Sequence, residues 1–176
     1  LFQNFVIILI LIAGAGFLSL SEIALAGSRK VKLKILAEAG EERAQQVLDL
    51  QENSANFFAA SQIGLNAVAI LGGILGEAAF RPYLVDLVTR FYSGPWAETI
   101  GFVLSFTLVT SLFILFADLM PKRLAMIAPE KIAISVINPI QVFITICRPL
   151  AWFINAIANL LFRLFKNEFF STLWTE

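Results

Sequence analysis

The chain has 176 residues with 13 basic and 13 acidic side chains, so its net charge is zero and general nucleic-acid binding is not expected. Hydrophobic residues make up 59% and charged residues 15%, histidine is absent, and the mean hydropathy is +0.81. These values exclude an ordinary soluble domain and predict an all-α membrane protein that has the lipid bilayer as a partner. Cys147 is the single cysteine, which excludes an internal disulfide and a thiolate metal cage.

Three segments are long and apolar enough to cross about 30 Å of hydrocarbon. They are residues 5–25, 57–80 and 96–120. Residues 28–53 mix apolar side chains with charges of both signs, which predicts an amphipathic helix or a helical hairpin at the membrane surface. Residues 81–95 contain two prolines and a glycine and are expected to form a short connection.

Beyond the third span, prolines at positions 129, 139 and 149 are expected to interrupt the helical pattern. The apolar residues 150–165 are short for a span, so helices in the cytoplasmic interface are favoured over a fourth crossing. Trp152 suits such an interfacial position. The predicted division is a three-helix transport core at 1–135, a juxtamembrane helical region at 136–168 and a tail at 169–176.

The distribution of lysine and arginine predicts the orientation. Five lie between the first and second spans, two between the second and third, and six after the third. The positive-inside rule therefore predicts an outside N-terminus and a cytoplasmic C-terminus. The expected location is the cell membrane, as a multi-pass protein of a bacterial inner or plasma membrane.

Glu22, Glu77 and Asp118 are carboxylates within the predicted spans. A charge at the centre of a bilayer costs at least about 2.5–3.5 kcal/mol, so each carboxylate needs a partner or a function. Glu77 precedes Arg81 by four residues, and an interfacial ion pair is the preferred interpretation.

Six polar residues near the cytoplasmic ends of the spans are expected to share one layer, about 5–15 Å from the membrane boundary. They are Ser19, Ser21, Glu22, Gln62, Asn66 and Asp118. Pro121 has no N–H, so the carbonyl of Ala117 is a further candidate ligand. These oxygens suit Mg²⁺ or a related hard cation better than zinc or copper.

Each of these residues also has a structural interpretation. A serine in a membrane helix commonly bonds back to its own helix. Glu22 and Asp118 could pair with Arg29 or Lys122, and Gln62 with Asn66 could join helices. The coincidence of depth across three helices favours the functional interpretation.

Three runs carry a resemblance: LSLSEIALAGSRK at 18–30, QIGLNAVAILGG at 62–73 and FADLMPKRLA at 116–125. In order and spacing they resemble the transmembrane domain of the CorC/cyclin M (CNNM) family. The resemblance implies a homodimer followed by cytosolic CBS-pair and CorC-like modules. It also implies Mg²⁺ export, with exchange against Na⁺ as the candidate coupling, and an ion held near the cytoplasmic side.

By position, Ser21, Asn66 and Asp118 match the ion-binding residues of that family best, followed by Ala117 and Ser19. Two positions depart from the family pattern. Asp118 stands where the family often has Glu, and Gln62 stands where it has a smaller polar residue. Both keep an oxygen ligand but change its reach, which bears on Mg²⁺ specificity.

Three hypotheses follow. The main one is a Mg²⁺ or related divalent-cation exporter that works by alternating access, and the alternative is an exporter of di- or polyamines whose ammonium groups meet Glu22 and Asp118. The third is a membrane scaffold in which the polar layer only joins helices. An enzyme is not expected, because the chain has no histidine, phosphate loop or nucleophile–base pattern.

Overall fold

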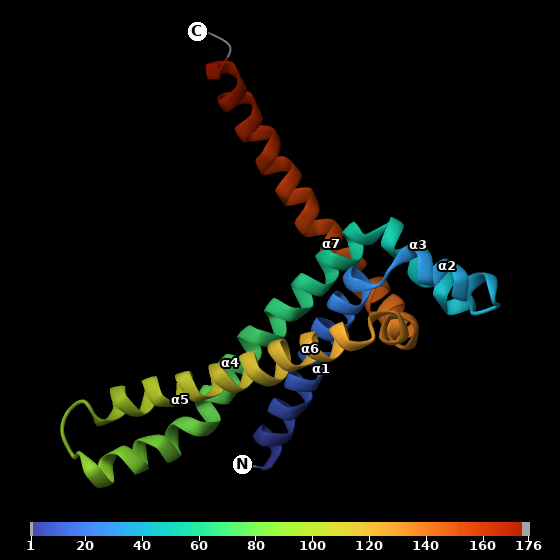
Figure 1. Cartoon of the computed structure of the whole chain (residues 1–176). Coiled ribbons are helices and arrows are strands. Elements are labelled where there is room, and N and C mark those ends of the chain that lie inside the picture. Colours follow the sequence, from blue (N-terminus) through green and yellow to red (C-terminus); the bar gives the residue numbers. More distant parts are fainter. Residues whose placement is uncertain (1, 174–176) are drawn as a thin grey trace.

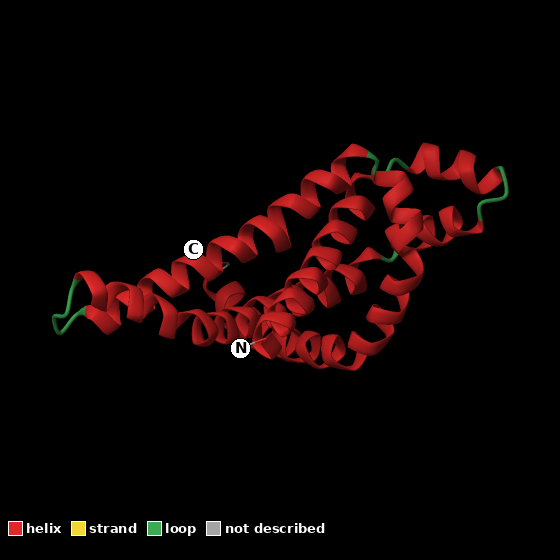
Figure 2. Cartoon of the chain, turned by 90° about the horizontal axis from the view of Figure 1, so that it is seen from below, coloured by secondary structure: helices red, strands yellow, loops and turns green. Residues whose placement is uncertain are grey.

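The computed structural model describes the backbone of residues 2–173, which forms helices and no strand (Figure 2). The helices are α1 (Phe2–Gly27), α2 (Lys30–Glu38), α3 (Glu42–Glu52), α4 (Ser54–Phe91), α5 (Ala97–Phe113), the π-helix η1 (Ile114–Leu119), α6 (Met120–Ile127) and α7 (Pro129–Leu173). The all-α class is therefore confirmed. Residues 174–176 of the predicted tail lie outside the described residues.

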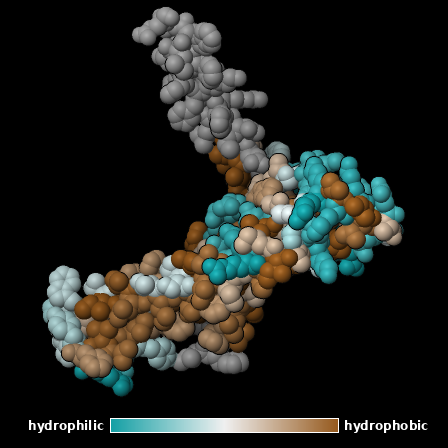
Figure 3. Space-filling view, in the orientation of Figure 1, coloured by the Kyte–Doolittle hydropathy of each residue, from teal (hydrophilic) through white to brown (hydrophobic). Residues whose placement is uncertain are grey.

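The three predicted spans fall within α1, α4 and the continuous segment α5–η1–α6. Each has a stretch apolar and long enough to cross a membrane: Phe5–Gly27, Ser54–Phe91 and Ala97–Ile127. In Figure 1 the helices α4 and α5 lie side by side as an antiparallel pair, and α1 packs against α4. Hydrophobic residues cover the α4–α5 pair, whereas hydrophilic ones gather over α2 and α3 (Figure 3). Of the two forms expected for residues 28–53, the structure has the helical hairpin.

Prolines do not end helices in this fold as the sequence suggested. Helix α4 continues through Pro82 to Phe91, so the short connection expected at 81–95 is wrong and the linker starts at Tyr92. Helix α7 likewise continues through Pro139 and Pro149. Apolar helices tolerate proline because neighbouring groups and local adjustments satisfy the freed carbonyls, whereas breaking the helix in lipid would expose more of them.

The first part of α7, Pro129–Leu150, is a fourth helix long and apolar enough to span. The expected interruptions at Pro139 and Pro149 are absent, so the boundary predicted at residue 150 lies inside one continuous helix. This part packs Ala133 and Ile137 into one core with Leu18 of α1 and Val47 of α3. In Figure 1 the later part of α7, in red, points in another direction and extends away from the other helices.

Glycines bring α4 and α5 into close contact. A Cβ on Gly72 would overlap the ring of Phe113, and one on Gly76 would overlap Val109. Gly101 of α5 meets Val85 of α4 in the same way. We call these three glycines and the side chains they meet the glycine seam. Gly72 and Gly76 therefore face the third span of their own chain, and small residues at such positions permit close helix packing.

Candidate cation site

A cavity of about 320 Å³ lies between α1, α4 and the α5–η1–α6 segment. We call it the polar cavity. Its polar or backbone contributors are Glu22, Gln62, Asn66, Ala117, Asp118 and Lys122, and its remaining walls are Ala15, Leu65, Ala69, Phe113 and Ile114. Five of the seven residues that the sequence proposed as ligands therefore line one cavity.

Helical spacing explains how α1 and α4 present these residues. Ala15 and Glu22 are seven residues apart on α1, and Gln62, Asn66 and Ala69 follow a four- and then three-residue spacing on α4. Residues three, four and seven apart lie on the same helix face. Each helix thus contributes one polar face to the cavity, and this face alternates with small apolar residues that leave room for a ligand.

Asp118 lies in the π-helix η1, where the third span departs from α-helical geometry. Pro121 follows by three residues and cannot donate a hydrogen bond to the carbonyl of Ala117, which is the physical reason for a local change of helix type. Helix α1 approaches this point at Gly16, where a Cβ would lie 3.2 Å from Pro121 and 3.4 Å from the carbonyl oxygen of Phe116. The close approach places Ser19, three residues later, beside Asp118.

Two side chains hold the Asp118 carboxylate. The ammonium of Lys122 lies 2.6 Å from Oδ1 of Asp118, one helical turn away. The Ser19 hydroxyl donates to the same Oδ1 at 3.1 Å and lies 3.4 Å from the Asp118 carbonyl oxygen. Ser19 is completely buried, whereas the Asp118 side chain is 47% exposed. Asp118 is therefore anchored on one edge and open on the other.

The two serines of α1 have opposite roles in the structure. Ser21 donates its hydroxyl to the Phe17 carbonyl of its own helix at 2.7 Å. It lines a separate, very small cavity beside Leu25, Phe57 and α7 rather than the polar cavity. The bond back to its own helix, which is common for a serine in a membrane helix, is thus made by Ser21 and not by Ser19. The structure does not bring Ser21 to the other proposed ligands.

Glu22 is the second carboxylate of the polar cavity. Among the residues whose side chains are described, no lysine or arginine lies within 4.0 Å of it, so the expected pair with Arg29 is not formed. In the same part of the chain, no group of three His, Cys, Asp or Glu side chains is arranged to hold a metal ion. The cavity therefore offers two carboxylates, two amides and one internal ammonium.

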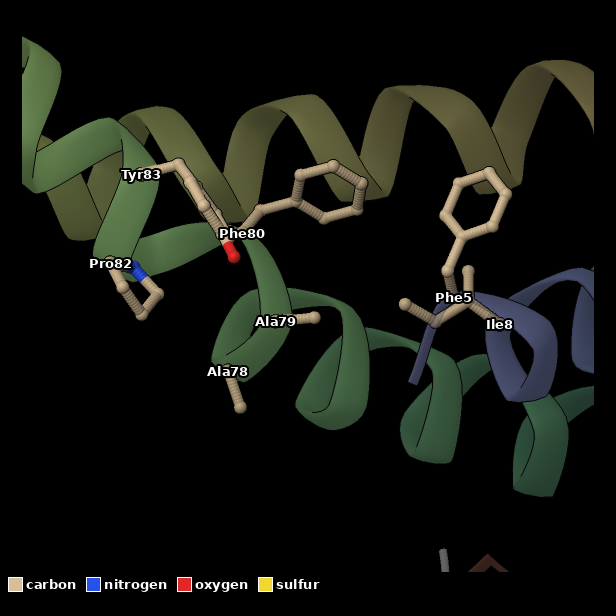
Figure 4. Close-up of a pocket in the computed structure, with 7 residues that line it drawn as sticks. All are labelled: Phe5, Ile8, Ala78, Ala79, Phe80, Pro82 and Tyr83. Carbon is tan, nitrogen blue, oxygen red and sulfur yellow. The ribbon is translucent and has the colours of Figure 1, made fainter. Parts of the chain in front are cut away.

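Glu77 lies outside the polar cavity. Its Oε1 is 3.8 Å from Nε of Arg81, which confirms the predicted ion pair, and the Arg81 guanidinium lies 5.6 Å from the Phe102 ring centroid. A second cavity of about 320 Å³ lies near this end of α4, where Phe5 and Ile8 of α1 face Phe80, Pro82 and Tyr83 of α4 (Figure 4). Its lining includes no carboxylate, so it is not a counterpart of the polar cavity.

Two features of the site were not predicted as part of it. Lys122 was considered only as a partner that would neutralise Asp118, although its i+4 spacing from Asp118 signalled that both side chains would share a helix face. Gly16 was not singled out, because a glycine that permits close approach is visible only once the facing segment, here η1, is known.

Comparison with known proteins agrees with this architecture. The family model described as the cyclin M transmembrane N-terminal domain matches residues 6–172. Proteins named polyamine export protein are similar: that of Escherichia coli (strain K12) is 54% identical over 164 residues, covering 93% of this chain and 37% of the relative. The one from Salmonella typhimurium is 54% identical over 160 residues, covering 91% and 36%, and the one from Haemophilus influenzae is 46% identical over 166 residues, covering 94% and 38%.

The chain thus spans little more than a third of the length of these relatives. The family model, in contrast, covers nearly the whole chain and includes all three runs of the resemblance. Together with the apolar helices, this match shows a multi-pass membrane protein. The chain belongs to the family of cyclin M transmembrane N-terminal domains.

Proposed function

We propose that this domain exports organic di- or polyamines and binds their ammonium groups in the polar cavity. One observation carries the proposal: the cavity already holds a primary alkylammonium, that of Lys122, 2.6 Å from the Asp118 carboxylate. Charge-assisted hydrogen bonds of this kind are the strong ones, and Ser19 orients the acceptor. A substrate ammonium can use the same chemistry.

The remaining features suit a cation with two charges separated by a hydrocarbon chain. Glu22 supplies a second carboxylate, and Gln62 and Asn66 supply neutral oxygens. Ala15, Leu65 and Phe113 give apolar walls for methylene groups. The volume of about 320 Å³ lies at the lower end of the range of small-molecule sites.

The names of the relatives support this substrate class over the main hypothesis from the sequence. Proteins named for polyamine export share 54% and 46% identity with the chain over nearly its whole length. Mg²⁺ export was the main hypothesis and polyamine export the alternative, and the comparisons favour the alternative. Coupling to Na⁺, the homodimer and the following cytosolic modules stay predictions of the resemblance.

Mg²⁺ as substrate makes different demands on the same cavity. It requires nearly octahedral oxygen ligands at about 2.0–2.1 Å and gives up its water reluctantly. Asp118 would have to exchange its ammonium partner for the metal, with Glu22, Asn66, Gln62 and the Ala117 carbonyl completing the set. Ser21 could not join them without a change in its hydrogen bond.

The test is transport by the whole protein that carries this domain, reconstituted in vesicles and loaded with radiolabelled putrescine or with Mg²⁺ and a fluorescent indicator. We expect putrescine efflux that is lost in Asp118→Asn and kept in Asp86→Asn, an exposed carboxylate paired with Arg90 at the far end of α4. Efflux of Mg²⁺ alone would restore the main hypothesis. No efflux of either cation from folded protein would favour the scaffold.

A further inference from the structure

Lys122 occupies the position that a substrate ammonium needs. Its ammonium is 2.6 Å from Oδ1 of Asp118, and both residues line the polar cavity. The Ser19 hydroxyl donates to the same oxygen at 3.1 Å. Because Oδ1 already accepts from both groups, a second ammonium competes with the lysine for this oxygen.

The ion pair between Lys122 and Asp118 can separate at low cost. The side chains of Lys122 and Asp118 are 35% and 47% exposed, so neither is locked in place by burial. Partly exposed ion pairs contribute little net stability, because solvent screens them and the flexible lysine loses rotamer freedom. Glu22, in contrast, has no such partner within the described side chains and is available to an incoming charge.

Lys122 changes the net charge of the polar cavity. Two carboxylates and one ammonium leave the cavity with a net charge of −1, which suits a single positive charge. When Lys122 withdraws, the cavity offers −2, which suits a dication. We propose that Lys122 is a tethered competitor of the substrate and thereby a specificity-determining residue. It neutralises Asp118 in the empty domain and is displaced from it by one end of a diamine. This inference rests on the proposed function.

The displacement has a consequence for the transport cycle. An uncompensated carboxylate within a membrane span is costly, so an empty domain with a bare Asp118 would change conformation slowly. With Lys122 back on Asp118, the empty cavity carries one fewer uncompensated charge through that step. The lysine thus weakens substrate binding and speeds the return of the empty domain.

The experiment compares wild type with Lys122→Gln in the whole protein, by putrescine titration, net efflux and putrescine–putrescine exchange. In Lys122→Gln we expect putrescine to bind about tenfold more tightly, because its competitor is gone, while net efflux falls about tenfold and exchange persists. Exchange needs no return of the empty domain, so it separates this role from general damage. Lys122→Arg should restore net efflux in part, and Arg123→Gln, an exposed neighbour outside the cavity, should match wild type.

Unchanged or weaker putrescine binding in Lys122→Gln, or equal loss of exchange and net efflux, would overturn the tethered competitor and leave the proposed function standing. A wild-type protein that neither binds nor moves putrescine would overturn the proposed function, and this inference with it. A size-exclusion profile identical to wild type shows that each variant is folded.

Discussion

Helix α4 joins two regions of opposite character, the polar cavity and the glycine seam. At the seam, glycines let Phe113 and Val109 contact the α4 backbone, and Ser105 donates to the Glu77 carbonyl at 3.1 Å. At the polar cavity, about two turns earlier on α4, the same helix faces Asp118 across open space with Gln62 and Asn66. This small domain therefore encloses a site by packing α4 tightly against the third span at the seam and keeping the two apart at the polar cavity.

Backbone geometry follows the same division. The seam side of the third span, α5, is a regular helix from Ala97 to Phe113, whereas the cavity side contains the π-helix η1 followed by Pro121. π-helical turns are rare and are often found at functional sites. The irregular turn places Asp118, while the regular one keeps α4 and α5 together.

The largest effect on stability is expected from a substitution in the glycine seam. Gly72→Leu forces a side chain into the space occupied by the Phe113 ring, and overpacking of this kind costs about 1–3 kcal/mol, occasionally more. We expect a clear fall in the thermal unfolding midpoint in detergent, together with weaker ligand binding because Phe113 also lines the polar cavity.

Gly73→Leu is the matched control, because a Cβ at Gly73 meets no atom within 4 Å. Equal destabilisation by the two substitutions would show that the seam is not a tight contact.

The next largest effect is expected on putrescine affinity, from a substitution in the polar cavity. Ser19→Ala removes the hydroxyl that donates to Asp118 at 3.1 Å, and a hydrogen bond to a charged group contributes about 1.5–3 kcal/mol. Because the Asp118 side chain is 47% exposed and keeps its solvent contact, we expect a loss near the lower limit, measured as about a tenfold weaker putrescine affinity by calorimetry.

Ser21→Ala serves as the comparison, since Ser21 bonds to the Phe17 carbonyl of its own helix. We expect its putrescine affinity to stay within about twofold of wild type. A large loss in Ser21→Ala with none in Ser19→Ala would contradict the placement of the site and favour the ligand set implied by the family resemblance.

The smallest effect lies at the Glu77–Arg81 pair. Glu77→Gln removes an ion pair of 3.8 Å in which the arginine is 45% exposed, and partly exposed pairs contribute about 0–1 kcal/mol. We expect a slight shift in the unfolding midpoint and an unchanged putrescine affinity. A tenfold change in affinity would mean that Glu77 belongs to the transport path.

Much of the architecture could be predicted because the patterns involved are local. Hydropathy located three spans, and the four-residue spacing of Glu77 and Arg81 predicted their contact. The depth of Glu22, Gln62, Asn66 and Asp118 along the spans indicated a common layer, which follows from the fixed rise of a helix. The structure brings these four residues to one cavity.

The predictions that were wrong have a common cause. Each depended on which groups surround the residue in the folded protein. Each helix position turns by about 100°, so Ser19 and Ser21, two positions apart, point in nearly opposite directions. The sequence could not decide which of the two points to Asp118. The rule that proline ends a helix misjudged Pro82, Pro139 and Pro149, where an apolar environment favours continuing the backbone hydrogen bonds.

The central claim is that the polar cavity binds a diamine between Glu22 and Asp118. The most direct measurement is calorimetric titration of the purified protein with putrescine, with butylamine as the one-charge analogue, and with Mg²⁺, in wild type and Glu22→Gln. We predict putrescine to bind at least about tenfold more tightly than butylamine, and Glu22→Gln to remove that advantage. Equal affinity for the two amines, or saturable binding of Mg²⁺ alone, would contradict it.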